Sequence, residues 1–268
     1  NVDETVVNRG HALIGNWVHD VADSDRAEHV FRLQGGDKVF VAFNHFEAED
    51  FKSNITIRGD SQQVVVYHNI LDRNLTFQPQ NATGHGSDEY VHHCVADSNL
   101  FIGREYDNGY GSRYEAIRTV ANDIAIRNNV IYDYGGAISI ASNDTVGPSQ
   151  RIRIHHNTVI GIAPNSTLAT IEAGCDDVSL TNNILFNSTT EEPSVQYDTL
   201  VTVINEYSAE TMVSDWNMVF GQNWDNAEVH FFVSSLGFQT LTEWQTATTQ
   251  DLNSLMQDPS FDGLDPVT

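Results

Sequence analysis

Basic side chains are scarce in this sequence, and only Lys38 and Lys52 are lysines. The 13 lysines and arginines stand against 37 aspartates and glutamates, which gives a formal net charge of -24 at pH 7. A surface with this charge repels the phosphates of DNA and RNA, so we expect no nucleic-acid partner. The charge suits a secreted protein. It would also repel an acidic polysaccharide unless arginines or a bound cation line the binding groove.

Cysteines and long apolar runs are also scarce. Cys94 and Cys175 are the two cysteines, and the repeat described below puts them three coils apart, at about 4.8 Å per coil. A disulfide needs Cα atoms within roughly 7 Å, so we expect two buried thiols and no bridge. No apolar run reaches the roughly 20 residues that a membrane-spanning helix needs, so we expect no membrane span.

An asparagine recurs in a similar apolar setting at intervals of 25 to 34 residues. The copies read LIGNWV, VAFNHF, VYHNIL, ADSNLF, IRNNVI, IHHNTV, LTNNIL and SDWNMV, and their central residues are Asn16, Asn44, Asn69, Asn99, Asn129, Asn157, Asn183 and Asn217. A period of this length is typical of repeat proteins, in which each repeat buries its apolar face against its neighbours.

Apolar residues alternate with polar ones on both sides of each asparagine. In the copy around Asn129, Ile124 and Ile126 precede it and Ile131 follows it. This alternation predicts a strand with one buried face, and a second predicted strand precedes most copies. Two strands and two corners in 25 to 30 residues leave no room for a crossover helix. The repeats therefore predict an all-β, single-stranded right-handed parallel β-helix of about eight coils over residues 1–222.

The asparagines have a structural role in such a fold. An asparagine at a corner can adopt the left-handed conformation, and amides stacked in successive coils can hydrogen-bond as a ladder. We expect residues 223–268 to close the solenoid, with a C-terminal end that is either truncated or continued by another domain. Within them TLTEWQTAT predicts a short helix, with Thr240 or Thr242 as the N-cap and Glu243 in the first turn.

A polar column precedes the asparagines by 11 or 12 residues. It contains Arg32, Arg58, Asp88 or Glu89, Arg118 and Glu172, and we expect stacked coils to set these side chains about 5 Å apart. Guanidinium groups at that spacing can bind the carboxylates or sulfates of successive sugars. Arg58, Glu89 and Arg118 could instead pair with one another as a structural feature of the face.

A long insertion near this column, GREYDNGYGSRYE, carries Tyr106, Tyr110 and Arg113. Aromatic and polar side chains on a loop of a rigid scaffold suit stacking against sugars, so these residues are candidate substrate ligands. The alternative is a lid whose tyrosines fold back onto the coil.

The stretch from Glu28 to Leu71, EHVFRLQGGDKVFVAFNHFEAEDFKSNITIRGDSQQVVVYHNIL, resembles secreted right-handed parallel β-helix proteins. It is most similar to the polysaccharide lyases that include alginate lyases and chondroitinase B. Arg58-Gly59 matches the Arg-His-Gly motif of that group without its histidine, and Arg32 stands where the catalytic lysine would lie.

This resemblance implies an extracellular or cell-surface protein that cleaves an acidic polysaccharide by β-elimination. Arg32 and Arg58 would then be the catalytic residues, because the reaction needs a base and stabilisation of the developing negative charge. Glu47, Glu49 and Asp50 are the candidate ligands of a calcium ion. The other hypothesis is a non-catalytic adhesin or structural module that self-associates through the ends of the solenoid.

Overall fold

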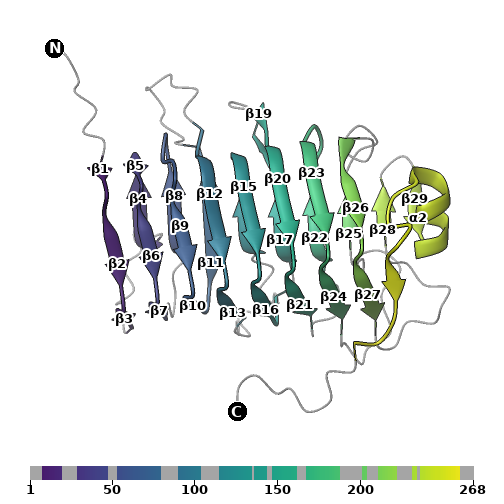
Figure 1. Cartoon of the computed structure of the whole chain (residues 1–268), viewed down its shortest axis with the longest axis horizontal. Helices are drawn as coiled ribbons and strands as arrows, with labels where there is room; N and C mark the ends of the chain where they lie inside the picture. Colours follow the sequence, from purple (N-terminus) through teal and green to yellow (C-terminus); the bar gives the residue numbers. More distant parts are fainter. Residues whose placement is uncertain are drawn as a thin grey trace, which may run out of the picture.

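The chain folds as an elongated parallel β-solenoid in which successive coils lie side by side from the N-terminal to the C-terminal end (Figure 1). The computed structural model describes residues 8–19, 29–47, 53–79, 90–103, 115–134, 136–143, 147–161, 167–187, 201–203, 211–221, 231–233 and 236–259. Within these residues three long sheets run along the solenoid. We refer to them as sheets 1, 2 and 3, in the order in which the chain visits them within a coil.

Sheet 1 contains β2 (Ala12–Ile14), β6 (Phe40–Ala42), β9 (Val65–Tyr67), β12 (His92–Asp97), β15 (Asn122–Arg127), β20 (Gln150–His155), β23 (Asp176–Thr181) and β26 (Val213–Asp215). Sheet 2 contains β3 (Trp17–Val18), β7 (His45–Phe46), β10 (Ile70–Leu71), β13 (Leu100–Ile102), β16 (Val130–Tyr132), β21 (Thr158–Gly161), β24 (Ile184–Asn187), β27 (Met218–Gly221) and β30 (Leu255–Met256). Neighbouring strands in both sheets are parallel.

Sheet 3 contains β4 (His29–Gln34), β8 (Ser53–Arg58), β11 (Asn74–Gln78), β14 (Glu115–Thr119), β17 (Gly136–Ile140), β22 (Thr167–Ile171), β25 (Val201–Val203), β28 (Phe231–Val233) and β29 (Gly237–Gln239). Its strands are parallel except at the end, where β29 is antiparallel to β28. Two short pairs complete the structure: β1 (Asn8–Arg9) with β5 (Gly36–Asp37), and β18 (Ser142–Asn143) with β19 (Gly147–Pro148).

A coil therefore has three strands, one more than the minimum of two that the sequence indicates. The strand before each asparagine belongs to sheet 1, and the residues directly after it form the short strand of sheet 2. The all-β parallel β-helix prediction is confirmed. The predicted inward positions are also confirmed, since Ile124, Ile126 and Ile131 are all buried in the core.

The eight asparagines form a continuous hydrogen-bonded ladder between sheets 1 and 2. From Asn44 onward, the side-chain oxygen of each accepts from the backbone N–H of the asparagine one coil earlier at 3.0 Å. The same oxygen accepts from that residue's Nδ2 at 2.9 to 3.1 Å. From Asn44 onward each Nδ2 also donates to a backbone carbonyl of the preceding coil at 2.8 to 3.0 Å. The predicted ladder is confirmed.

The left-handed conformation lies one residue before each ladder asparagine, so its assignment to the asparagines themselves is wrong. The residues with positive φ at this corner are Gly15, Phe43, His68, Ser98, Asn128, His156, Asn182 and Trp216. The preceding residue turns the chain, which leaves the asparagine side chain free to point along the solenoid axis into the ladder.

The C-terminal end is closed by a helix, α2 (Leu241–Thr248). Thr240 is its N-cap and forms a capping box with Glu243. Thr240 is one of the two N-caps that the sequence predicts, and the predicted helix is confirmed. Trp244 is fully buried; its ring stacks on that of Phe231, and its Nε1 donates to Asp251 at 2.9 Å. The other oxygen of Asp251 accepts from Nδ2 of the last ladder asparagine at 2.9 Å, so this carboxylate ends the ladder.

The two cysteines are free and buried, as predicted. Burial raises the pKa of Cys94 to about 12 and that of Cys175 to about 11. Among the described residues there is also no helix with the length and hydropathy needed to cross a membrane.

Candidate functional site

The predicted arginine ladder does not exist as a single column. In sheet 3, Arg32 is aligned with Thr56, which is aligned with Thr76 and then with Arg118. Arg32 and Arg118 therefore share a column but are separated by two intervening strands, at roughly 4.8 Å per step. Arg58 lies in a different column, in register with glutamines of β4 and β11.

The length of the corner between sheets 3 and 1 explains the error. In sheet 3, Ile57 and Thr119 are both in register with Phe77, so they occupy equivalent positions. In sheet 1, Gln62 and Asn122 are both in register with His92 and are equivalent in the same way. The corner after β8 is thus two residues longer than the corner after β14. Counting back from the asparagine therefore places Arg58 and Arg118 at one position although they lie two residues apart.

The three arginines contact side chains of this chain. Nη2 of Arg32 donates to Oε1 of Gln34 at 2.9 Å, and Nη1 of Arg118 lies 3.4 Å from Oε1 of Glu115. Arg58 faces the side-chain amide of Gln78. With that amide turned so that its oxygen points at the guanidinium, the oxygen accepts hydrogen bonds from Nη2 and Nε of Arg58 at 2.6 Å each. Catalysis by Arg32 and Arg58 and ligand binding by Arg118 stay predictions.

Six further candidates, Glu89, Tyr106, Tyr110, Arg113, Glu49 and Asp50, lie outside the described residues. Glu47 is described, and its carboxylate lies 3.2 Å from Nε2 of His45. No group of three or more His, Cys, Asp or Glu side chains within the described ranges is arranged to hold a metal ion. The calcium site stays a prediction, because two of its three proposed ligands are not described.

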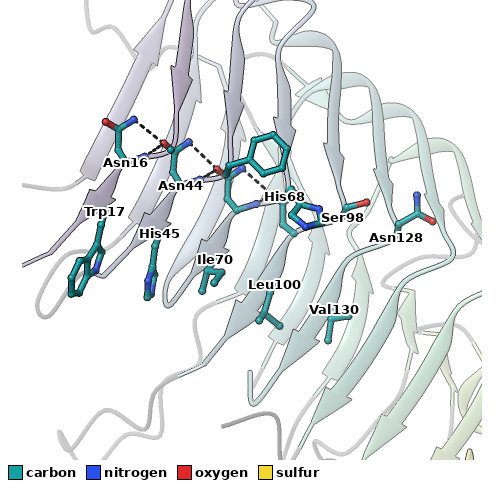
Figure 2. Close-up of a pocket in the computed structure, with 14 residues that line it drawn as sticks. Asn16, Trp17, Asn44, His45, His68, Ile70, Ser98, Leu100, Asn128 and Val130 are labelled. Carbon is teal, nitrogen blue, oxygen red and sulfur yellow. Dashed lines mark hydrogen bonds between the residues drawn. The ribbon is translucent and has the colours of Figure 1, made fainter. Parts of the chain in front are cut away.

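A groove with a volume of about 860 Å³ runs along the solenoid above the asparagine ladder. One wall is the row of left-handed corner residues Gly15, Phe43, His68, Ser98 and Asn128, and the other is the row Trp17, His45, Ile70, Leu100 and Val130 in sheet 2. The ladder asparagines form the floor. Figure 2 shows the Trp17-to-Val130 row on one side of the ladder, with labelled residues of the corner row on the other. We call this feature the ladder groove.

Aromatic rings are exposed at the N-terminal end of the ladder groove. Trp17 is 64% exposed and Phe43 is 53% exposed. The Trp17 and His45 rings belong to adjacent coils and are nearly parallel, with centroids 6.2 Å apart and an interplanar angle of 14°. In the corner row, the ring centroids of Phe43 and His68, which belong to adjacent coils, lie 5.4 Å apart. The groove thus presents flat apolar surfaces to solvent, and large exposed apolar patches often mark binding sites.

The lining of the ladder groove carries no Asp, Glu, Lys or Arg side chain among its 14 residues. A carboxylate lies just beyond the corner row, where Oδ1 of Asp97 accepts from Ser98 Oγ and from Asn128 Nδ2 at 2.9 Å each. Partial burial tends to raise the pKa of Asp97, but hydrogen bonds from Asn128, Ser98 and Arg127 together hold it below its ordinary value. Asp97 is therefore ionised at neutral pH, and because Nε of Arg127 lies 2.9 Å from its Oδ2, this edge of the groove carries an ion pair.

A second, polar pocket of about 440 Å³ lies on sheet 1. Arg151 forms two hydrogen bonds with the carboxylate of Asp123, at 2.6 and 2.8 Å, which hold the pKa of Asp123 below its ordinary value. His92 and His93 contact each other through their Nδ1 atoms at 2.5 Å. Adjacent residues of a regular strand point to opposite faces, and the positive φ of His93 breaks that alternation where the two rings meet.

Sequence reasoning missed the ladder groove although a signal for it is present. In the first five copies the residue after the asparagine is aromatic or aliphatic, and the next residue is apolar as well. Two consecutive apolar residues break the alternation of a half-buried strand, so one of them must face outward.

No family model matches the sequence, and neither the curated proteins nor the solved structures contain a match.

Proposed function

We propose that the protein is an extracellular solenoid that binds a polysaccharide in the ladder groove. The observation that carries the proposal is the exposed ring of Trp17, which lies nearly parallel to the His45 ring of the adjacent coil in an open groove. The flat, C–H-rich faces of a sugar ring stack on such rings, while its hydroxyl groups need polar partners. The ladder groove supplies those partners at Ser98 and Asn128.

Binding is better supported than cleavage at this site. β-Elimination needs a base and a cationic group that stabilises the charge developing beside the sugar carboxylate. The ladder groove is lined by two histidines that could accept a proton, but by no lysine or arginine. Lyase chemistry at Arg32 and Arg58 is therefore a separate prediction, on a different sheet, with its own test.

Assembly through the solenoid ends is less well supported. Pairing between copies requires open strand edges at both ends of the stack. At the C-terminal end of sheet 3, β28 is covered by the antiparallel β29, and Trp244 of α2 stacks on Phe231. These elements cover part of the surface that a second copy would need.

Native affinity electrophoresis tests the proposal. The protein is run through gels that contain alginate, pectate, chondroitin, xylan, galactomannan or hydroxyethyl cellulose, and we expect at least one of them to retard it. Trp17→Ala removes the most exposed ring of the groove and should weaken binding by at least about tenfold, or about 1.4 kcal/mol. Trp216→Ala is the matched control, because Trp216 has a similar exposure of 61% and is not a groove-lining residue.

Two results would reject the proposal. One is the absence of retardation in every gel, and the other is equal retardation of the wild type and Trp17→Ala. Absorbance of unsaturated products, measured in the same mixtures with and without calcium, tests the lyase prediction independently.

A further inference from the structure

Equivalent side chains repeat along the ladder groove at the spacing of the coils. Trp17 is in register with His45, which is in register with Ile70, and the register continues through Leu100 to Val130. Four steps of about 4.8 Å give a row roughly 19 Å long, parallel to the solenoid axis. A ligand that contacts the whole row must be linear and must lie along this axis.

The charges around the row limit the chemistry of such a ligand. The lining contains no lysine or arginine that could compensate an anion. The nearest described guanidinium beside the corner row belongs to Arg127, and its Nε already donates to Oδ2 of Asp97 at 2.9 Å. The lowered pKa of Asp97 keeps this carboxylate charged at neutral pH. A polyanion would therefore find no cationic side chain in the groove lining to pair with, in a protein of net charge -24.

Hydroxyl groups, in contrast, find suitable partners. Ser98 and Asn128 donate to Asp97 and so present oxygen acceptors whose orientation is fixed. The rings of His45 and His68 add nitrogen atoms that can donate or accept according to tautomer. All four groups are uncharged when the histidines are neutral, which matches the hydrogen-bonding needs of a neutral sugar.

We infer that the ligand of the ladder groove is an uncharged, linear polysaccharide that lies parallel to the solenoid axis. This inference rests on the proposed function and goes beyond it by assigning the charge, shape and direction of the ligand. It also replaces the acidic polysaccharide expected from the family resemblance, because the arginines that would bind carboxylates lie on sheet 3, outside the groove lining.

A matched pair of ligands tests the charge. Polygalacturonate and its fully methyl-esterified form share a backbone and differ in the carboxylate, and they are compared with the neutral and acidic polysaccharides of the same panel. We expect the tightest ligand to be neutral and the methyl ester to bind at least about tenfold more tightly than polygalacturonate. Binding of the neutral ligand should change less than about twofold between low and high salt, because no ion pair is formed.

Oligosaccharides of increasing length, prepared from the tightest ligand, test the direction. We expect the affinity to rise until the oligosaccharide spans about five sugars, comparable to the five positions of the Trp17-to-Val130 row, and then to level off. A disaccharide that binds as tightly as the polymer would overturn the axial arrangement.

The remaining outcomes separate the inference from the proposed function. If an acidic polysaccharide is the tightest ligand and Trp17→Ala abolishes its binding, the inference is wrong and the proposed function stands. If no polysaccharide, neutral or acidic, retards the protein, the inference and the proposed function are both wrong. If a neutral polysaccharide binds equally well to Trp17→Ala, its site is not the ladder groove, and both are again wrong.

Discussion

Replacing Asn129 by alanine removes one complete step from the middle of the asparagine ladder. The side chain is buried, and its Oδ1 accepts from the backbone N–H and Nδ2 of Asn99 at 3.0 Å each. Its Nδ2 donates to the carbonyl of Ala96 and to Oδ1 of Asn157, again at 3.0 Å. The substitution therefore removes four hydrogen bonds and leaves buried groups of three neighbouring residues without these partners.

The expected cost follows from those four bonds. A buried hydrogen bond contributes about 1 kcal/mol net, and an unsatisfied buried group costs about 1 to 3 kcal/mol. Asn157 Oδ1 keeps its bond from the backbone N–H of residue 129, so part of the loss is compensated. We expect Asn129→Ala to lower the free energy of unfolding by about 3 kcal/mol, measured by urea denaturation and circular dichroism.

Asn128→Gly is the matched control for this measurement. Asn128 is adjacent, exposed and in the left-handed conformation that glycine adopts without strain, and its side chain donates an exposed hydrogen bond to Asp97. We expect a cost of about 0.5 kcal/mol. If Asn129→Ala costs less than about 1 kcal/mol, or no more than the control, the ladder does not stabilise the solenoid as we infer.

Three further predictions concern other parts of the chain. The pKa of Asp123 is lowered mainly by Arg151, so Arg151→Gln should destabilise the fold at pH 7 by less than about 1 kcal/mol. This loss of stability should vanish as the pH falls through the folded pKa of Asp123, because the carboxylate is then protonated. Equal losses in urea titrations at pH 7 and in acid would contradict the prediction. Cys94 and Cys175 should react with a thiol reagent at pH 8 only after unfolding, and rapid labelling of the native protein would show that they are not buried. Gly103→Ala should destabilise the fold by about 3 kcal/mol or more in urea titrations, since a Cβ there would clash with the backbone oxygen of Asp133; an unchanged midpoint would contradict this.

The fold could be predicted because its stabilising contacts repeat in the sequence. Each copy carries an asparagine followed two residues later by a core residue, such as Ile131 after Asn129, and this spacing stays constant while loop lengths vary. The third strand was not predicted, since strands as short as His45–Phe46 give too little alternation to detect. The left-handed corner was misplaced by one residue because Phe43 and Trp216 are not typical left-handed residues, whereas asparagine is.

The candidate site was much less predictable. The position of Arg58 relative to Arg118 depends on a difference of two residues between two corners, and that difference appears only in the strand register. The ladder groove depends on which of two successive apolar residues faces outward. At Trp17 and Val18 the sequence shows an apolar pair, whereas the solenoid exposes the tryptophan and packs the valine against the core.

Intrinsic fluorescence during titration with the tightest neutral polysaccharide tests the central claim most directly. If the sugar chain stacks on Trp17, the emission of the wild type and of Trp216→Ala should shift to shorter wavelength on binding, and that of Trp17→Ala should not. The same blue shift in Trp17→Ala would place the bound chain elsewhere and would contradict binding in the ladder groove.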